Sequence, residues 1–114
     1  MSEFEIQKID TITIIQISGD MVSSKIESFE NICNVALKNE PEILAINMKY
    51  TDHIDSISIN HLFRLGKKLI EKEIKFLIYD VSPRINELLE VIKFDTIVNI
   101  MTKERFEKDF LRTS

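Results

Sequence analysis

Residues 43–58 read ILAINMKYTDHIDSIS, an apolar run followed by a polar loop and an Asp-Ser pair. The apolar run at 43–48 is nearly continuous, which is typical of a strand covered on both faces in a parallel sheet. Asp55 and Ser56 belong to residue types that cap helix N-termini, and a helix pattern follows them. This stretch therefore predicts an α/β fold in which a buried strand leads into a helix.

Segments on both sides extend this alternation. Residues 4–9 and 12–17 carry alternating or β-branched apolar side chains around a short polar turn, which predicts an antiparallel hairpin. Ser24 with Glu27 three positions later is a capping-box pattern, and it predicts a helix that Pro41 ends. The chain thus begins with a hairpin and continues into a helix before the central strand.

Downstream of the second helix, residues 76–79 predict another buried strand. Ser82 and Pro83 then mark a helix start, and apolar residues follow at helical spacing, namely Ile85, Leu88, Leu89 and Ile92. Residues 97–100 predict a short strand, and Thr102 is expected to cap a terminal helix with Phe106 and Phe110 on its inner side.

Together these elements predict the architecture. Because strands alternate with helices after the hairpin, right-handed crossovers should produce a largely parallel sheet. We expect an α/β fold with a mixed sheet of four to five strands, covered by about four helices. The N-terminal hairpin would be its antiparallel part, and residues 1–114 should form a single domain.

Composition disfavours several functional classes. A net charge of −4, with scattered lysines and arginines, gives no electrostatic footprint for nucleic acid or an anionic membrane. No apolar stretch is long enough to span a bilayer, and the N-terminus does not resemble a signal sequence, so we expect a cytoplasmic protein. The single cysteine, Cys33, excludes an internal disulfide and should act as a small hydrophobe.

The helix after Asp55 has two distinct sides when its residues are placed at 100° intervals. The predicted core stripe consists of Ile59, Leu62, Phe63, Gly66, Leu69 and Ile70. Ile57, His61 and Arg64 fall on the opposite side, beside the helix start. We predict that these three residues bind a partner, together with Met21 and Ser23 of the earlier turn. The simpler alternative is that Asp55 and Ser56 only cap the helix.

An enzyme would have to use Asp52, His53 and Asp55, which crowd one loop. Three polar residues in a loop are usually solvated, and no cysteine or second nearby histidine completes a metal set. Gly66-Lys67-Lys68 lacks the glycine-rich loop of a phosphate-binding motif. The sequence therefore favours a binding protein without catalytic residues, cofactor or metal.

The order of these pieces resembles the STAS family of the anti-sigma factor antagonist type. In that family a Gly-x-x-Asp turn follows an early strand, and an Asp-Ser pair opens the helix after the next strand. The corresponding pieces here are ISGDMV at 17–22, IDSIS at 54–58 and the helix start at 81–89. The resemblance implies a bacterial regulator that binds an anti-sigma factor and acts in transcription signalling.

The same resemblance implies roles for individual residues. Ser56 matches the serine that the anti-sigma factor phosphorylates through its own kinase activity, and a metal-dependent serine phosphatase would reverse the modification. Asp55 and Asp20 would support this site. Nucleotide and metal would then belong to the partners, and this chain would have no catalytic role.

Two positions depart from the antagonist pattern. Val22 stands where the family's turn usually has aspartate, so Asp20 of the same turn would have to substitute for it. Ser58 stands where many antagonists have glycine, and this variant resembles scaffold members of stress-signalling assemblies. The alternative implied is a scaffold subunit of a multi-protein complex, either a homo- or a hetero-oligomer.

Overall fold

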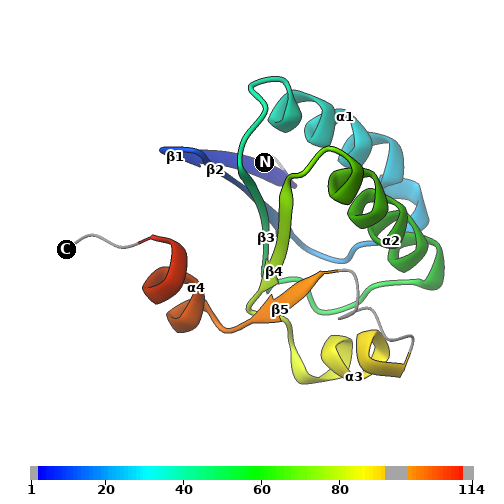
Figure 1. The fold of residues 1–114 in the computed structure, drawn as a ribbon. Coiled ribbons are helices and arrows are strands. Elements are labelled where there is room, and N and C mark those ends of the chain that lie inside the picture. The colour runs from blue at the N-terminus through cyan, green and yellow to red at the C-terminus, as the bar shows by residue number, and fades with distance from the viewer. Residues whose placement is uncertain (1–2, 92–97, 112–114) are drawn as a thin grey trace.

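A five-stranded mixed sheet forms the centre of the fold in this computed structural model, which describes residues 3–91 and 98–111. From one edge to the other, the strands are β1 (Phe4–Ile9), β2 (Ile12–Ser18), β3 (Ile43–Tyr50), β4 (Lys75–Tyr79) and β5 (Asn99–Met101). β1 and β2 pair antiparallel, and every later pairing is parallel (Figure 1). This confirms the predicted fold class and the predicted hairpin.

Helices cover the sheet unequally on its two faces (Figure 1). One face carries α1 (Ile26–Leu37), α2 (Ser56–Glu71) and α3 (Pro83–Val91), and the other carries α4 (Lys103–Phe110). A short 3-10 turn, η1 (Ser23–Lys25), precedes α1. Within the described residues, no helix is both long and apolar enough to cross a membrane.

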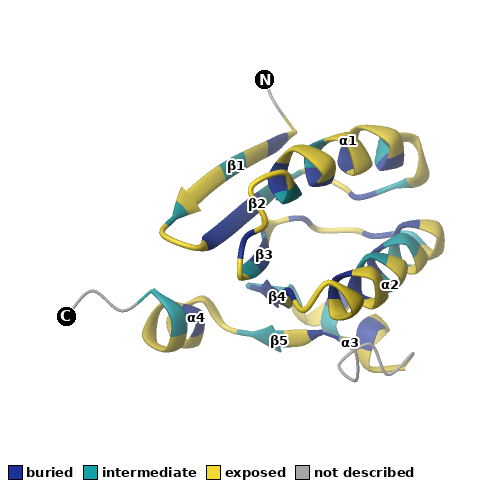
Figure 2. Cartoon of the chain, turned by 45° about the horizontal axis from the view of Figure 1, so that its top comes forward, coloured by how far each residue is buried: buried dark blue, intermediate teal, exposed yellow. Residues whose placement is uncertain are grey.

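The alternation of side chains along β2 explains why this strand is apolar almost throughout. Ile15 and Ile17 point into the core beneath α1 and α2, whereas Ile12 and Ile14 belong to a second core beneath α4. Phe106 of α4 is fully buried in that second core and stacks on Tyr79 with a ring-centroid distance of 4.4 Å. Figure 2 shows β2 as buried along most of its length. Burial on both faces of the sheet explains its near-continuous apolar pattern.

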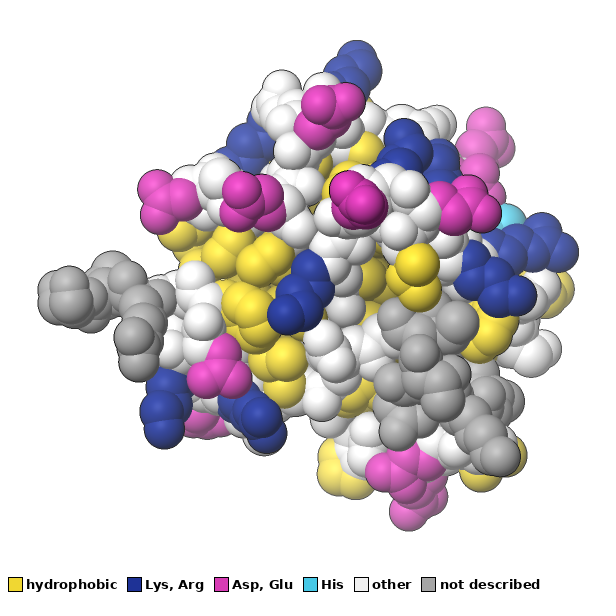
Figure 3. Space-filling model, in the orientation of Figure 1, with side chains coloured by type: hydrophobic (Ala, Val, Ile, Leu, Met, Phe, Trp, Pro, Cys, Tyr) yellow, Lys and Arg dark blue, Asp and Glu magenta, His cyan; other side chains and the backbone are white. Residues whose placement is uncertain are grey.

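The single helix α4 leaves its face of the sheet partly open. Figure 3 shows hydrophobic side chains gathered between the hairpin and α4, framed by acidic and basic side chains. The partly buried members of this second core are Ile9, Ile43, Met101, Phe110 and Leu111. The face covered by three helices therefore holds the larger core.

Two predicted helix starts are confirmed by side-chain hydrogen bonds. The Ile85 N–H donates to Ser82 Oγ at 3.2 Å, and the Arg105 N–H donates to Thr102 Oγ1 at 3.2 Å. The capping box predicted at Ser24 is wrong, because Ser24 lies within η1 and the N-cap of α1 is Lys25, which makes no side-chain cap bond. The chain enters α1 through a 3-10 turn instead.

Several apolar positions differ from the predicted core. Ile70 is 56% exposed, although its angular position on α2 placed it in the core stripe. The chain turns back toward β4 just after it, and Leu69 and Ile74 are buried there. Leu88 is 44% exposed, whereas Ile85 and Leu89 are fully buried. The predictions for Ile92 and Ile97 lie outside the described residues.

Candidate partner-binding site at the start of helix α2

The loops that follow β2 and β3 lie side by side, because these two strands are parallel and their carboxyl ends point the same way. The Gly19 N–H donates to the Tyr50 carbonyl at 3.0 Å, and the Met21 N–H donates to the His53 carbonyl at 2.9 Å. The Asp55 N–H then donates to the Met21 carbonyl at 3.1 Å. These backbone bonds continue the pairing of the strands into the loops and hold the start of α2 beside the turn that leads to α1.

Met21 has a structural role in this junction. It forms an isolated parallel bridge with Ile54, and its side chain is fully buried. The prediction that Met21 belongs to a partner-binding surface is therefore wrong for its side chain, since the bridge turns that side chain into the core. Thr51 anchors the second loop by donating from Oγ1 to the Ile17 carbonyl at 3.1 Å.

The Asp55 carboxylate joins the two loops. Its Oδ1 accepts a hydrogen bond from the Ser58 N–H at 2.8 Å, which is the predicted N-cap of α2. Its Oδ2 accepts a hydrogen bond from the Ser23 N–H at 2.8 Å, from the turn that begins η1. We call this pair of bonds the Asp55 bridge. The second bond was not predicted, because the sequence gives no signal that residues 23 and 55 are neighbours.

The surroundings of Asp55 favour its charged form. The pKa of this carboxyl lies below its ordinary value. The largest cause is the nearby Ser58 hydroxyl, followed by the Ser58 N–H, and the Ser23 N–H lowers the pKa to a smaller extent. Desolvation acts in the opposite direction. The Ser58 hydroxyl is buried and lacks good hydrogen-bond geometry with any group in the described residues, so we attribute its effect to proximity. Asp55 is therefore an anion at neutral pH.

Ser56 and Ile57 are displayed on the outside of this junction. Ser56 is the first residue of α2 and is exposed, and the Ile57 side chain is 53% exposed. Ser23 is also exposed, on the other side of the Asp55 bridge. We call Ser23, Ser56 and Ile57 the Ser56 surface. Its residues come from the starts of η1 and α2, which the Asp55 carboxylate holds together.

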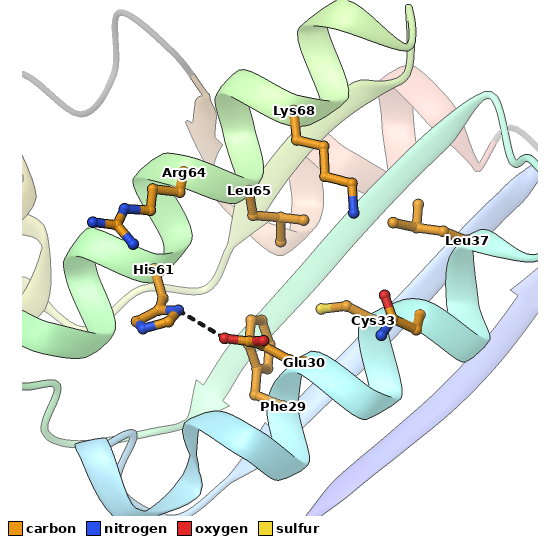
Figure 4. A pocket seen from close by; sticks show the side chains of 9 residues that line it. Phe29, Glu30, Cys33, Leu37, His61, Arg64, Leu65 and Lys68 are labelled. Atoms are coloured by element: carbon orange, nitrogen blue, oxygen red, sulfur yellow. Dashed lines mark ion pairs between the residues drawn. The ribbon is translucent and has the colours of Figure 1, made fainter.

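His61 and Arg64 lie elsewhere on α2. His61 Nδ1 is 3.0 Å from Glu30 Oε1, and both residues line a hollow between α1 and α2 together with Arg64 (Figure 4). Leu65 also lines this hollow. It was not predicted as a site residue, because the periodicity of α2 alone does not indicate which residues face α1. The structure thus separates the predicted partner residues into two neighbouring groups.

Asp20 is exposed in the turn that contains Gly19. Gly19 has φ +92°, a conformation that favours glycine, and an added Cβ would lie 3.3 Å from Lys25 Nζ. Within the described residues, no hydrogen bond links the Asp20 side chain to Ser56, so its supporting role remains a prediction.

The polar side chains of residues 52–55, which an enzyme would have to use together, contact different groups. His53 Nδ1 lies 3.2 Å from Arg84 Nη1, whereas the Asp55 carboxylate faces two backbone N–H groups. Asp52 is exposed. Across residues 3–91 and 98–111, no group of three or more His, Cys, Asp or Glu side chains is arranged to hold a metal ion.

Comparison with known proteins agrees with this fold. The family model described as STAS domain matches residues 3–107. No curated protein sequence matches this one. Solved structures with the same fold include an anti-sigma factor antagonist from Mycobacterium paratuberculosis, with TM-score 0.78 and 16% identity over 86% of this chain and 83% of that chain.

Two further solved structures align over almost their whole length. A putative anti-sigma factor antagonist from Thermotoga maritima has TM-score 0.85 and 16% identity, covering 96% of this chain and 95% of that chain. The anti-sigma factor antagonist SpoIIAA in its unphosphorylated form has TM-score 0.73 and 14% identity, covering 97% and 99%. SpoIIAA from Bacillus also has a solved phosphorylated form.

Likeness at such low identity establishes the fold, whereas the family follows from the sequence model. That model spans nearly the whole chain, from the first described strand into α4. The chain belongs to the STAS domain family.

Proposed function

We propose that this chain is an anti-sigma factor antagonist that works in the cytoplasm. It binds an anti-sigma factor through the Ser56 surface, and the serine kinase activity of that partner phosphorylates Ser56 to switch the interaction. The observation that carries this proposal is the Asp55 bridge, which holds exposed Ser56 and Ile57 in fixed positions beside Ser23. The solved antagonists that share the fold support it.

The position of Ser56 suits a reversible modification. Its side chain is exposed at the first residue of α2, where helix N–H groups and the positive end of the helix dipole favour an added phosphate. A phosphate brings about −1.5 to −2 charges at pH 7. Because Asp55 is already charged beside it, the local potential would change strongly without unfolding of the helix. A serine phosphatase would return the surface to its binding form.

Ile57 supplies the apolar part of the proposed interface. A half-exposed isoleucine next to a helix start can bury its side chain against a partner, and polar Ser23 and Ser56 form its border. A charge added at Ser56 would then lie at the edge of the buried contact. Losing about 1.4 kcal/mol of binding free energy weakens a complex tenfold, so one phosphate is sufficient for a switch.

The direct test uses an anti-sigma factor with a serine kinase domain, taken from the same genome, together with ATP. We expect intact-mass analysis to show one added phosphate on the wild type and peptide mapping to place it on Ser56. Ser56→Ala should remain unmodified, whereas Ser24→Ala, a matched change at an exposed serine of η1, should be modified normally. Ser56→Asp should bind the partner at least about tenfold more weakly. An unmodified wild type and a Ser56→Asp variant with unchanged binding would refute the proposal.

A scaffold subunit of a multi-protein stress-signalling complex is the second candidate. Ser58 favours it, since this buried residue occupies the position where many antagonists have glycine. A scaffold would form a large hetero-oligomer, which size-exclusion chromatography with light scattering would detect after mixing with candidate partners. A binary complex with the anti-sigma factor would instead support the antagonist.

A further inference from the structure

A hollow of about 240 Å³ lies between α1 and α2, beyond the Ser56 surface along α2. Figure 4 shows the side chains that line it from both helices. Its apolar wall consists of Phe29, Cys33 and Leu37 from α1 and Leu65 from α2. Pockets for small molecules combine such apolar walls with a few polar groups, and this hollow is slightly smaller than most of them.

The two ends of the α1–α2 hollow differ in charge. At one end, Glu30 Oε1 lies 3.0 Å from His61 Nδ1, so the acidic group already has a partner. At the other end, the Lys68 side chain points from α2 toward α1 near Leu37 (Figure 4). Within the described residues, neither Lys68 nor Arg64 has an ion-pair partner. The unpaired charge around the hollow is therefore positive.

Cys33 keeps the wall of the hollow apolar. Burial raises the pKa of its thiol to about 12, with Glu30 acting in the same direction and Lys68 in the opposite one. The thiol is thus neutral at physiological pH, and it is the smallest of the apolar side chains that line the hollow. A neutral, compact group at this position leaves space that a ligand can occupy.

We propose that the α1–α2 hollow binds a small amphipathic carboxylate, with its apolar part against Cys33 and Leu65 and its carboxylate at Lys68. Charge complementarity selects the anion, since the basic groups are unpaired and Glu30 is already engaged. The hollow, of about 240 Å³, is small for a ligand pocket, so it suits a short chain or a single ring better than a larger ligand. Octanoate has suitable size and chemistry as a probe.

The test is a titration of the ¹⁵N-labelled full chain with octanoate, followed by amide chemical shifts. We expect saturable shifts concentrated in α1 and α2 at the residues that line the hollow, and about tenfold weaker binding of octanamide, which has the same tail without the charge. Octyltrimethylammonium should not bind there. Absence of saturable shifts, or equal binding of octanamide, would overturn the proposal.

Two lysines on α2 provide a matched pair of variants. Lys68→Gln should weaken octanoate binding about tenfold, because it removes the charge at the end of the hollow near Leu37. Lys67→Gln removes the same charge from the same helix, but Lys67 lies over the Phe63 ring at 5.0 Å and does not line the hollow, so binding should be unchanged. Equal binding by both variants would contradict the assignment. Ser56→Ala should bind octanoate normally, so this result is independent of the proposed antagonist function.

Discussion

The starts of α1 and α2 lie close together, yet they are held in different ways. α2 begins with a local cap, because Asp55 immediately precedes it and accepts a hydrogen bond from the Ser58 N–H. α1 has no side-chain cap of its own, and the Ser23 N–H of the preceding turn donates to the same Asp55, 32 residues away in sequence. One carboxylate therefore organises both helix starts and makes the Ser56 surface a single unit.

Replacing Asp55 should have the largest effect on this arrangement. Asp55→Ala removes both hydrogen bonds of the bridge and leaves two backbone N–H groups without their carboxylate acceptor. We expect the melting temperature to fall by about 5 °C or more. Thermal unfolding followed by circular dichroism measures this change. Ser56→Ala is the matched control, and an equally small shift in both variants would show that the bridge contributes little.

Acid should weaken the bridge without a mutation. The folded-state pKa of Asp55 is lower than its unfolded value, so its stabilisation is complete above the ordinary aspartate pKa of about 4 and disappears as the pH falls through the lowered folded value. Denaturant unfolding of the wild type and of Asp55→Asn should therefore differ most near neutral pH and converge in acid. A stability difference that does not depend on pH would contradict the role of the charge.

Ser23→Pro should remove only the bond on the α1 side. Proline has no N–H, and it suits the first residue of a helical turn after Val22, whose ψ of 165° is extended. We expect about half of the stability loss of Asp55→Ala. Hydrogen exchange should show the Ser58 amide still protected. Ser23→Ala keeps the N–H and should behave like the wild type, so a loss equal to that of Ser23→Pro would point to the side chain instead.

Ser24→Ala should have the smallest effect, since Ser24 makes no cap bond to α1. We expect the free energy of unfolding to change by less than about 0.5 kcal/mol. Thr102→Ala is the comparison, because Thr102 Oγ1 accepts the Arg105 N–H at the start of α4, and it should cost about 1 kcal/mol. Urea unfolding distinguishes these values. A large loss of stability in Ser24→Ala would indicate that Ser24 caps α1 after all, and would contradict the structure.

Local signals were sufficient to predict much of the fold. The caps at Ser82 and Thr102 involve donors three residues away, so the sequence contains both partners. The apolar runs of the central strands reflect burial on both faces of the sheet. The exposure of Ile57 followed from its angle on α2, because a helix presents its residues at fixed intervals.

The remaining features depend on contacts between distant segments. Met21 is buried because its backbone pairs with Ile54. The apolar pattern of neither loop indicates this pairing. The second half of the Asp55 bridge and the α1–α2 hollow also require elements about 30 residues apart to lie together. Such contacts follow from the strand order and not from local propensity, so they could not be predicted from one sequence.

The most direct measurement compares two exposed apolar residues for binding to the proposed partner, an anti-sigma factor. Ile57 belongs to the Ser56 surface and is 53% exposed, whereas Val35 on α1 is 48% exposed and lies outside that surface. Isothermal titration calorimetry should show binding at least about tenfold weaker for Ile57→Asp and near wild type for Val35→Asp. Equal affinities for the two variants would contradict the account.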